Sequence, residues 1–250
     1  MKFDMVFEGG GAKGMVFVGA MQVFLSQNHT YGRLLGTSAG AITAALLAAG
    51  YTTQEMTDAL TEKQDGKPVF AGFMGMPAEP DKAAVQASEI RDVLRHIDLP
   101  FIPGSLEGKV DDMILDWLRT QPNFRHLYSF VELGGWFAAD SFLAWLKRKL
   151  DSGTFNGKPR QFSAMRLEEF YQATQHDLSL IGSDTTGHEM LVLNHRTAPD
   201  LPVVWAVRMS MSIPLVWQEV VWQKEWGTYR GRDMTGHAIV DGGLLSNFPI

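Results

Sequence analysis

The sequence contains no cysteine, which excludes disulfide bridges, thiolate nucleophiles and cysteine-based zinc sites. Basic residues are also few: 22 Lys and Arg stand against 28 Asp and Glu, and the formal net charge is −6. They are scattered along the chain rather than clustered, so we expect no nucleic-acid partner. The seven histidines show no HExxH-type spacing, and no metal site is predicted.

Long hydrophobic runs are absent as well. The longest mostly apolar stretch, Ala39–Ala49, is far shorter than the ~20 residues that cross a bilayer. The N-terminus carries Asp4 and lacks the sustained apolar segment of a secretory signal. We therefore expect a soluble, cytoplasmic protein whose contact with a membrane is peripheral. Delivery to another cell is compatible with this sequence, and no pattern indicates an oligomeric state.

What is present is a chain of 250 residues that is 45% hydrophobic, enough for the core of one large α/β domain over residues 1–250. Short apolar runs alternate with helical patterns, which predicts a mixed sheet flanked by helices. The predicted strands are Phe3–Phe7, Tyr31–Leu35, Leu178–Ile181, Glu189–Leu193, Val216–Trp222 and Ala238–Val240. The predicted helices are Met15–Ser26, Ala39–Ala49, Thr52–Lys63, Ser88–His96, Lys109–Arg119, Asp140–Leu150, Ser163–Thr174 and Val203–Ser210.

Two local patterns refine this prediction. Thr52-x-x-Glu55 has the spacing of a capping box and marks the start of a helix. The stretch Gly66–Pro80 is rich in Gly, Pro, Met and Phe and fits no regular element, so we predict a mobile loop there. This loop opens a helical and mobile insertion over about 66–160.

The sharpest chemical signal is a G-x-S-x-G sequence that lies between the predicted strand at Tyr31–Leu35 and the following helix. A serine on such a tight turn projects its hydroxyl out of the fold, and small neighbours let the backbone pass close to it. The N-terminus of the helix behind it favours an anionic intermediate. Ser38 is therefore the candidate nucleophile. The motif reads Gly36-Thr37-Ser38-Ala39-Gly40.

A glycine-rich loop follows the first predicted strand and offers backbone N–H groups without side-chain obstruction, as an oxyanion hole requires. The loop reads Gly9-Gly10-Gly11-Ala12-Lys13-Gly14. The same glycines also spell G-x-G-x-x-G, the pattern of a dinucleotide site, but that site expects an acid about 20 residues later, and residues 26–40 contain none. A Walker A loop fails because Lys13 is followed by Gly14 rather than by Ser or Thr. We interpret the loop as an oxyanion hole.

A serine nucleophile also needs a base. Asp241 is the best candidate, because it follows an apolar run and precedes two glycines, Gly242 and Gly243, that leave its carboxylate unobstructed. The alternative is an α/β-hydrolase-like esterase with a Ser-Asp-His triad, for which His237 and Asp184 are the partners in suitable chain order. That fold places several strands before its nucleophile, whereas only one predicted strand precedes the one that leads to Ser38.

Together, the glycine loop, the G-x-S-x-G turn and Asp241-Gly242-Gly243 resemble the three signature blocks of patatin-like phospholipases, in the family's order. The segments 183–187 and 207–214 also resemble the family, and the likeness runs from Met5 to the end of the chain. The resemblance implies a three-layer α/β/α core whose mixed sheet is mostly parallel. It also implies a calcium-independent lipid acyl hydrolase of the phospholipase A or lysophospholipase type, with no cofactor and with a membrane phospholipid or another acyl lipid as substrate.

The resemblance also assigns roles. Ser38 attacks the acyl carbonyl, and Asp241 accepts its proton and returns it to the leaving alcohol. The oxyanion hole is the loop of Gly9, Gly10, Gly11 and Ala12, with the last three supplying the N–H groups. The supporting positions are Lys13, which lies either near an anionic head group or facing solvent, and the glycines that shape the motifs, which are Gly14, Gly36, Gly40, Gly242 and Gly243. One departure is that the chain stops at Ile250, where family members usually continue; we expect either a truncated chain or a further segment.

Lipid access is predicted from apolar residues near the insertion. The Phe70–Met76 loop, with Trp136, Phe137 and Trp217, is expected to form an exposed surface or an acyl tunnel. Two other classes of function remain open: a nucleotide-binding oxidoreductase that uses the glycine loop, and a binding module without activity. A transacylase has the same residues as a hydrolase and is not separated from it by sequence.

Overall fold

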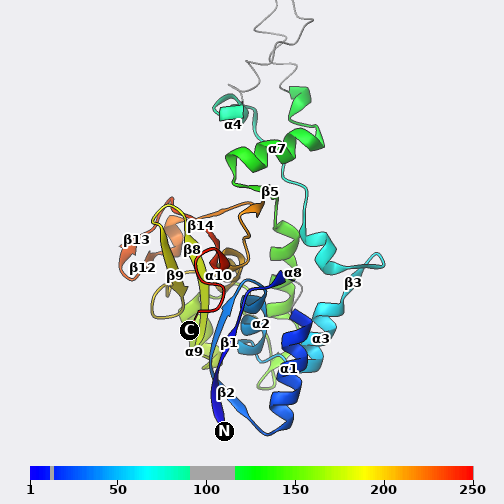
Figure 1. Cartoon of the computed structure of the whole chain (residues 1–250), viewed down its shortest axis with the longest axis vertical. Coiled ribbons are helices and arrows are strands. Elements are labelled where there is room, and N and C mark those ends of the chain that lie inside the picture. Colours follow the sequence, from blue (N-terminus) through cyan, green and yellow to red (C-terminus); the bar gives the residue numbers. More distant parts are fainter. Residues whose placement is uncertain (12–13, 91–115, 250) are drawn as a thin grey trace, which may run out of the picture. The chain divides into compact units, whose positions relative to one another are not determined.

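The computed structural model describes residues 1–11, 14–90 and 116–249, and Figure 1 shows the course of the chain. The chain forms two compact units. Unit 1 combines Met1–Phe73, Asp140–Pro214 and Glu219–Ile250, and unit 2 combines Met74–Ala139 and Leu215–Gln218. All three blocks of predicted site residues belong to unit 1. The prediction of a single domain with an insertion over about 66–160 stays a prediction.

A six-stranded sheet forms the centre of unit 1. Its strands are β1 (Lys2–Phe7), β2 (Thr30–Thr37), β8 (Leu178–Asp184), β9 (Glu189–Leu193), β11 (Val220–Val221) and β14 (Ala238–Asp241). The three longest, β1, β2 and β8, run parallel. The pairs β8–β9, β8–β14 and β14–β11 are antiparallel. The sheet is mixed and the α/β class is confirmed.

The register of β8 brings two other strands end to end. Thr37, the last residue of β2, pairs with Ile181, and Asp241, the last residue of β14, pairs with Gly182. Strand β9 pairs with residues 180–184 of β8 and so occupies one edge of that strand. Both β2 and β14 overlap this range, so they must share the other edge. Their carboxyl ends therefore meet at neighbouring positions of β8.

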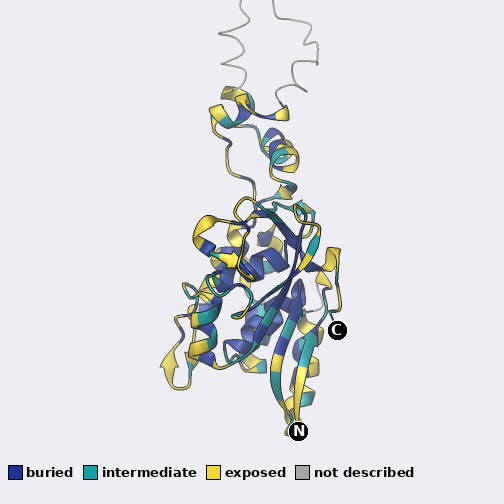
Figure 2. Cartoon of the chain, turned by 90° about the vertical axis from the view of Figure 1, so that its left-hand side faces the viewer, coloured by how far each residue is buried: buried dark blue, intermediate teal, exposed yellow. Residues whose placement is uncertain are grey.

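Helices pack on this sheet and on one another. They are α1 (Gly14–Ser26), α2 (Ala39–Ala48), α3 (Thr53–Thr61), α8 (Asp140–Asp151), α9 (Leu167–Thr174) and α10 (Val203–Ser210). Helix α2 lies against β1, β2 and β8, whereas α10 lies against β8 and β14. All residues of α2 are buried, which explains its composition of alanine, leucine and glycine, and Figure 2 shows the burial concentrated in the strands and inner helices. The Thr52–Glu55 capping box forms at the start of α3, as predicted.

Short elements complete unit 1. The hairpins are β3–β4 (Lys63–Gln64 and Lys67–Pro68), β6–β7 (Thr154–Phe155 and Lys158–Pro159) and β12–β13 (Thr228–Tyr229 and Arg232–Asp233). The 3₁₀ turns are η2 (Val69–Phe73), η3 (Lys224–Trp226) and η4 (Gly242–Leu244).

The prediction of a loop over Gly66–Pro80 is wrong for its first half. The ring of Phe73 packs edge-on against Phe142 and lies 5.3 Å from the ring of Trp145, and Phe70 packs against the same tryptophan. Phe73 is only 4% exposed. These aromatic rings are fixed by partners some 70 residues away, which no local pattern reveals. Phe73 therefore belongs to the core of unit 1 and not to an exposed lipid-binding loop.

Unit 2 contains the helices α4 (Lys82–Gln86) and α7 (Pro122–Glu132) and the parallel pair β5 (Gly135–Phe137) and β10 (Leu215–Trp217). Its small core is built from Val85, Ile90, Phe124 and Tyr128. The single strand predicted over Val216–Trp222 is wrong, because β10 pairs in unit 2 while β11 joins the central sheet. The helices predicted over Ser88–His96 and Lys109–Arg119 fall mostly outside the described residues.

Candidate active site

Ser38 occupies the turn between β2 and α2 with a strained backbone, φ 55° and ψ −122°. This combination is favourable essentially only for glycine, and surrounding contacts must hold a serine in it. The flanking residues Gly36 and Gly40 must be glycine because there is no room for a Cβ atom at either position. A Cβ on Gly36 would lie 2.4 Å from the carbonyl oxygen of Gly40, and one on Gly40 would lie 2.1 Å from that of Phe7. The strand–turn–helix context predicted for the G-x-S-x-G motif is confirmed.

The amide of Ser38 is held by the end of helix α10. Its N–H points at Ser210, with the nitrogen 3.1 Å from both the carbonyl oxygen and the hydroxyl oxygen of that residue. Ser210 is fully buried. This double acceptor is one of the contacts that fix the strained turn.

Asp241 lies at the end of β14, where its strand meets β2. Its N–H donates to the carbonyl oxygen of Ser212 at 2.8 Å, and its Oδ1 accepts from the N–H of Gly243 at 2.7 Å. Asp241 is only 4% exposed, and its Oδ2 is buried without an aligned hydrogen-bond partner among the described residues. One carboxylate oxygen is thus fixed, and the other is available to a neighbour.

The electrostatics of Asp241 suit a base. Burial raises the pKa of its carboxyl group above the ordinary range, and the effect outweighs the lowering by the Ser38 hydroxyl and the Gly243 N–H. No aligned hydrogen bond joins Oδ2 of Asp241 to the Ser38 hydroxyl among the described residues. Such contacts are often long in the absence of substrate.

The glycine loop lies against Ser38. A Cβ on Gly9 would stand 3.2 Å from the Cβ of Ser38 and 2.2 Å from Oδ1 of Asn247. The N–H of Gly9 already donates to the carbonyl oxygen of Asn247 at 3.1 Å, so Gly9 shapes the loop and has no free N–H to offer an oxyanion. Gly11 has a φ of +51°, which favours glycine. Ala12 and Lys13 lie outside the described residues, and Gly14 opens α1.

His237 and Asp184, the alternative partners, do form a pair. The Nδ1 of His237 lies 2.8 Å from Oδ2 of Asp184, whose Oδ1 accepts the N–H groups of Thr186 and Gly187. This pair lies farther along the sheet than Asp241, because Asp184 is level with Ile239. At ~3.4 Å per residue, the four-residue step from His237, just before β14, to Asp241 spans about 14 Å. Within the described chain, the side chain of His237 bonds to Asp184 and not to Ser38.

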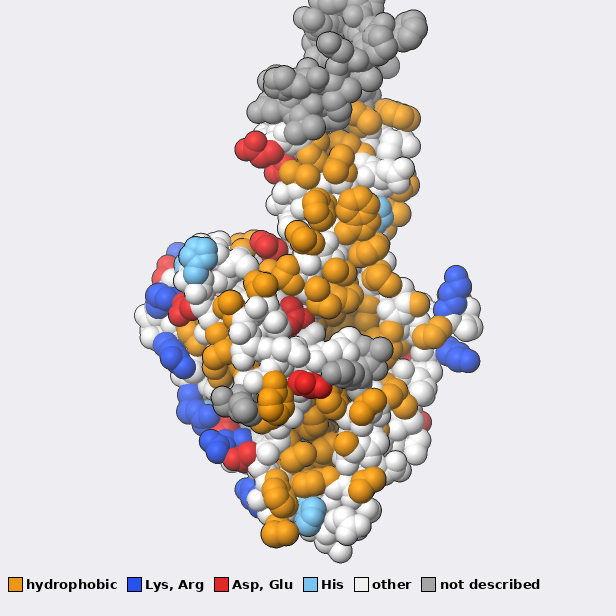
Figure 3. Space-filling model, in the orientation of Figure 1, with side chains coloured by type: hydrophobic (Ala, Val, Ile, Leu, Met, Phe, Trp, Pro, Cys, Tyr) orange, Lys and Arg blue, Asp and Glu red, His pale blue; other side chains and the backbone are white. Residues whose placement is uncertain are grey.

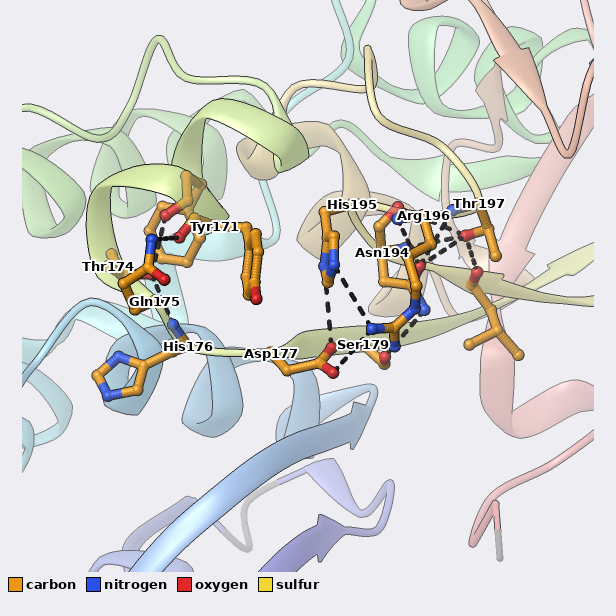
Figure 4. Close-up of polar contacts among 12 residues, drawn as sticks. Tyr171, Thr174, Gln175, His176, Asp177, Ser179, Asn194, His195, Arg196 and Thr197 are labelled. Carbon is orange, nitrogen blue, oxygen red and sulfur yellow. Dashed lines mark hydrogen bonds and ion pairs between the residues drawn. The ribbon is translucent and has the colours of Figure 1, made fainter.

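A second polar cluster lies at the opposite end of β8, and Figure 4 shows it. The imidazole of His195 stacks on the ring of Tyr171 at 3.8 Å, and Arg196 pairs with Asp177 at 3.0 Å. Asp177 directly precedes β8 and accepts the N–H of Leu34 through its carbonyl oxygen. The cluster therefore joins the amino end of β8 to the residues that follow the carboxyl end of β9, and it contributes no residue to the site at Ser38.

Sequence reasoning missed three residues that hold the site together: Ser210, Ser212 and Asn247. Their roles depend on backbone carbonyl groups or on contacts between distant segments. The Asp241-Gly242-Gly243 motif identified Gly242 and Gly243 as site residues, but it did not identify Asn247, which lies four residues after Gly243. The resemblance of segment 207–214 to the family was a signal for Ser210 and Ser212, whereas no sequence pattern marked Asn247.

Residues 1–11, 14–90 and 116–249 hold no cluster of three or more His, Asp or Glu side chains placed to bind a metal ion. In the same part of the chain, no helix has the length and hydrophobicity to span a bilayer. Exposed apolar side chains of α1 include Met15, Val16 and Val23, and Figure 3 shows apolar side chains distributed over the displayed face.

Known proteins resemble this chain over most of its length. The family model described as patatin-like phospholipase matches residues 5–250. The chain is 31% identical over 256 residues to the uncharacterized protein YqhO of Bacillus subtilis (strain 168), covering 100% of this chain and 66% of YqhO, so it spans slightly less than two thirds of that relative. VipD from Legionella pneumophila has a similar fold, with a TM-score of 0.50 and 18% identity over 100% of this chain and 47% of VipD.

Proposed function

Because the chain belongs to the patatin-like phospholipase family, we propose that it hydrolyses the carboxylic esters of acyl lipids with Ser38 as nucleophile and Asp241 as general base. The observation that carries the proposal is the meeting of β2 and β14 on one edge of β8. This register brings Thr37, which directly precedes Ser38, and Asp241 to neighbouring residues of β8, and the buried Asp241 carboxylate has one oxygen without a hydrogen-bond partner among the described residues. A phospholipase A or lysophospholipase activity is the form that we propose.

In the first half of the reaction, the Ser38 oxygen attacks the acyl carbonyl carbon while Asp241 Oδ2 takes the hydroxyl proton. The tetrahedral intermediate collapses to an acyl-serine ester, and Asp241 gives the proton to the departing alcohol. In the second half, water attacks the acyl-serine, Asp241 takes a proton from the water, and Ser38 recovers it as the fatty acid leaves. The raised pKa of Asp241 makes it a stronger base than an exposed aspartate.

The oxyanion of both intermediates is proposed to bind the N–H groups of Gly10, Gly11 and Ala12. Gly9 has its N–H on Asn247 and keeps the loop pressed against Ser38. The N-terminus of α2 begins at Ala39 and adds partial positive charge behind the reacting oxygen. Each oxyanion donor typically contributes about 2.7–4 kcal/mol.

We further propose that the reaction needs no calcium, because Asp241 supplies the base and backbone amides supply the charge stabilisation. The test is hydrolysis of a soluble short-chain ester with EDTA, compared with added Ca²⁺. Equal rates are expected. A rate that appears only with Ca²⁺ contradicts this part of the proposal.

The specific alternative is a triad that uses His237, which the 2.8 Å pair with Asp184 favours. Because Asp184 pairs with Ile239 rather than with Asp241, we propose a structural role for this pair, in which it links the end of β8 to the residue that precedes β14. The discriminating experiment is labelling with a fluorophosphonate probe, with the adduct located by mass spectrometry. The variants are Asp241→Asn, His237→Ala and Ser38→Ala, with His195→Ala as a matched histidine control.

Labelling at Ser38 that is lost in Asp241→Asn and kept in His237→Ala and His195→Ala supports the dyad. Loss in His237→Ala with retention in Asp241→Asn overturns it in favour of the triad. No labelling of the folded wild-type protein overturns the hydrolase proposal itself. Saturable binding of NAD(P) in calorimetry, together with absent labelling, favours the oxidoreductase alternative.

Peripheral contact with a lipid surface is proposed through the exposed face of α1, which starts directly behind the glycine loop and has no charged residue. Val16 is 67% and Val23 is 64% exposed. A helix face of this kind binds at a lipid interface through its apolar area. Val16→Ser with Val23→Ser is expected to slow hydrolysis of phosphatidylcholine vesicles and to spare a soluble ester. Gln22→Ser, on the same helix, is the control, and equal loss on both substrates contradicts the proposal.

A further inference from the structure

The end of helix α10 touches both proposed catalytic residues through their backbones. Ser210 accepts the N–H of Ser38, and Ser212 accepts the N–H of Asp241. One residue, Met211, separates the two anchors. Since β2 and β14 meet end to end on β8, no backbone pairing joins these two strands directly at the gap. The segment 210–212 spans that gap.

The anchors are themselves rigid. Ser210 and Ser212 are fully buried, and Met211 is 5% exposed. The N–H of Met211 bonds to the carbonyl oxygen of Val207, and that of Ser212 bonds to Met209, so the segment continues the hydrogen-bonding of the helix.

Arg208 strengthens this turn from within the core. Its guanidinium donates to the hydroxyl of Ser212, which in turn donates to the carbonyl oxygen of Arg208 at 2.6 Å. Arg208 is 3% exposed, and burial lowers its pKa to about 10, against the opposing influence of Asp140. The side chain therefore keeps its charge at neutral pH and ties Ser212 to the helix.

We propose that residues 210–212 are a positioning element, in which Ser210 holds the nucleophile and Ser212 holds the base, so that their two-residue spacing sets the distance between the Ser38 hydroxyl and the Asp241 carboxylate. The inference rests on the proposed roles of Ser38 and Asp241. The described hydrogen bonds of Ser210 and Ser212 with the proposed catalytic residues go to the backbone N–H groups of Ser38 and Asp241. The segment 210–212 therefore acts through the backbone of Ser38 and Asp241.

The test makes the backbone at Met211 more flexible and leaves Ser210 and Ser212 unchanged. Met211→Gly and Met211→Ala remove nearly the same side-chain volume, but only glycine frees the backbone. Displacement of reacting groups by about 1 Å can cost about 100-fold in rate, so Met211→Gly is expected to label with fluorophosphonate about 10- to 100-fold more slowly than Met211→Ala. For a soluble ester, kcat is expected to fall by a similar factor with KM unchanged.

A second readout reports the geometry directly. The Ser38 hydroxyl lowers the pKa of Asp241, so separation of the two groups is expected to move the acid limb of the pH profile upward in Met211→Gly and not in Met211→Ala. Thr174→Val is the outside control, because it removes a buried hydroxyl bonded to Phe170 at the far end of β8. It is expected to lower the unfolding temperature and to leave labelling at the wild-type rate.

If Met211→Gly does not fold, Ser210→Ala takes its place, since it deletes only the hydroxyl acceptor of the Ser38 N–H. A slower, pH-shifted reaction again supports the proposal. Wild-type rates and an unmoved acid limb in a folded Met211→Gly or Ser210→Ala overturn it while leaving the dyad intact. Absence of labelling in the wild type overturns the proposed function and this inference together.

Discussion

Ser38 and Ser210 are joined at two points, because the Ser38 N–H lies within 3.1 Å of both the carbonyl and the hydroxyl oxygen of Ser210. This contact secures a serine whose φ of 55° and ψ of −122° are suited to glycine. The turn is therefore held by its surroundings, and the conformation of this buried serine depends on contacts made 172 residues farther along the chain.

Replacement of the nucleophile is expected to reveal the strain. Ser38→Ala keeps the Cβ and the strain, while Ser38→Gly relieves it. A strained residue of this kind costs of order 1–3 kcal/mol, partly offset by the greater entropy of unfolded glycine, so we expect Ser38→Gly to be about 1 kcal/mol more stable than Ser38→Ala. Urea unfolding measures the difference. If Ser38→Ala is as stable as Ser38→Gly, the backbone at residue 38 is not strained.

Gly40 lies in the buried helix α2 and Gly19 in the exposed helix α1, and substitution by alanine is expected to change the stability of the protein in opposite directions at these two positions. Gly40→Ala places a Cβ 2.1 Å from the carbonyl oxygen of Phe7, and we expect a loss of about 1–3 kcal/mol or failure to fold. Gly19 of α1 has open space around it, so Gly19→Ala is expected to gain about 0.5–1 kcal/mol through helix propensity. Thermal unfolding of both variants tests this. Destabilisation by Gly19→Ala contradicts the open space around this position of α1.

Asp241→Asn is expected to abolish activity and to stabilise the protein at neutral pH. Asparagine retains an oxygen for the Gly243 N–H and removes the buried charge. The folded-state pKa of Asp241 is raised, so ionisation of this group costs stability as the pH rises through its unfolded and folded values. The advantage of the asparagine variant is therefore expected to grow with pH and to vanish in acid. Unfolding midpoints from pH 3.5 to 8 measure it, and an advantage that is largest in acid contradicts the assignment.

The acid limb of kcat/KM for a soluble ester is expected above the ordinary range of an aspartate. Only ionised Asp241 accepts the proton of Ser38, so activity falls as the pH drops through its raised pKa. The measurement is repeated in His237→Ala. A limb that disappears in that variant assigns it to the histidine and sinks the aspartate base.

Much of the local structure follows from the sequence alone. The G-x-S-x-G block predicts a strand–turn–helix because its glycines are demanded by contacts within five residues and with the neighbouring first strand. The capping box at Thr52 and Glu55 and the buried alanine-rich helix after Ser38 are likewise set by local spacing and by side-chain size. The three motif blocks also indicated the family, which the match over residues 5–250 shows.

Only the tertiary structure decided how these blocks meet. Strand β8 places Thr37 and Asp241 on neighbouring residues, and α10 bridges the gap through carbonyl oxygens, which every residue type carries and no sequence pattern marks. The packing of Phe73 against Phe142 and the split of the predicted strand Val216–Trp222 depend on distant partners in the same way. Local sequence therefore determined the turns and the helices, whereas long-range pairing and burial determined the site's geometry and the raised pKa of Asp241.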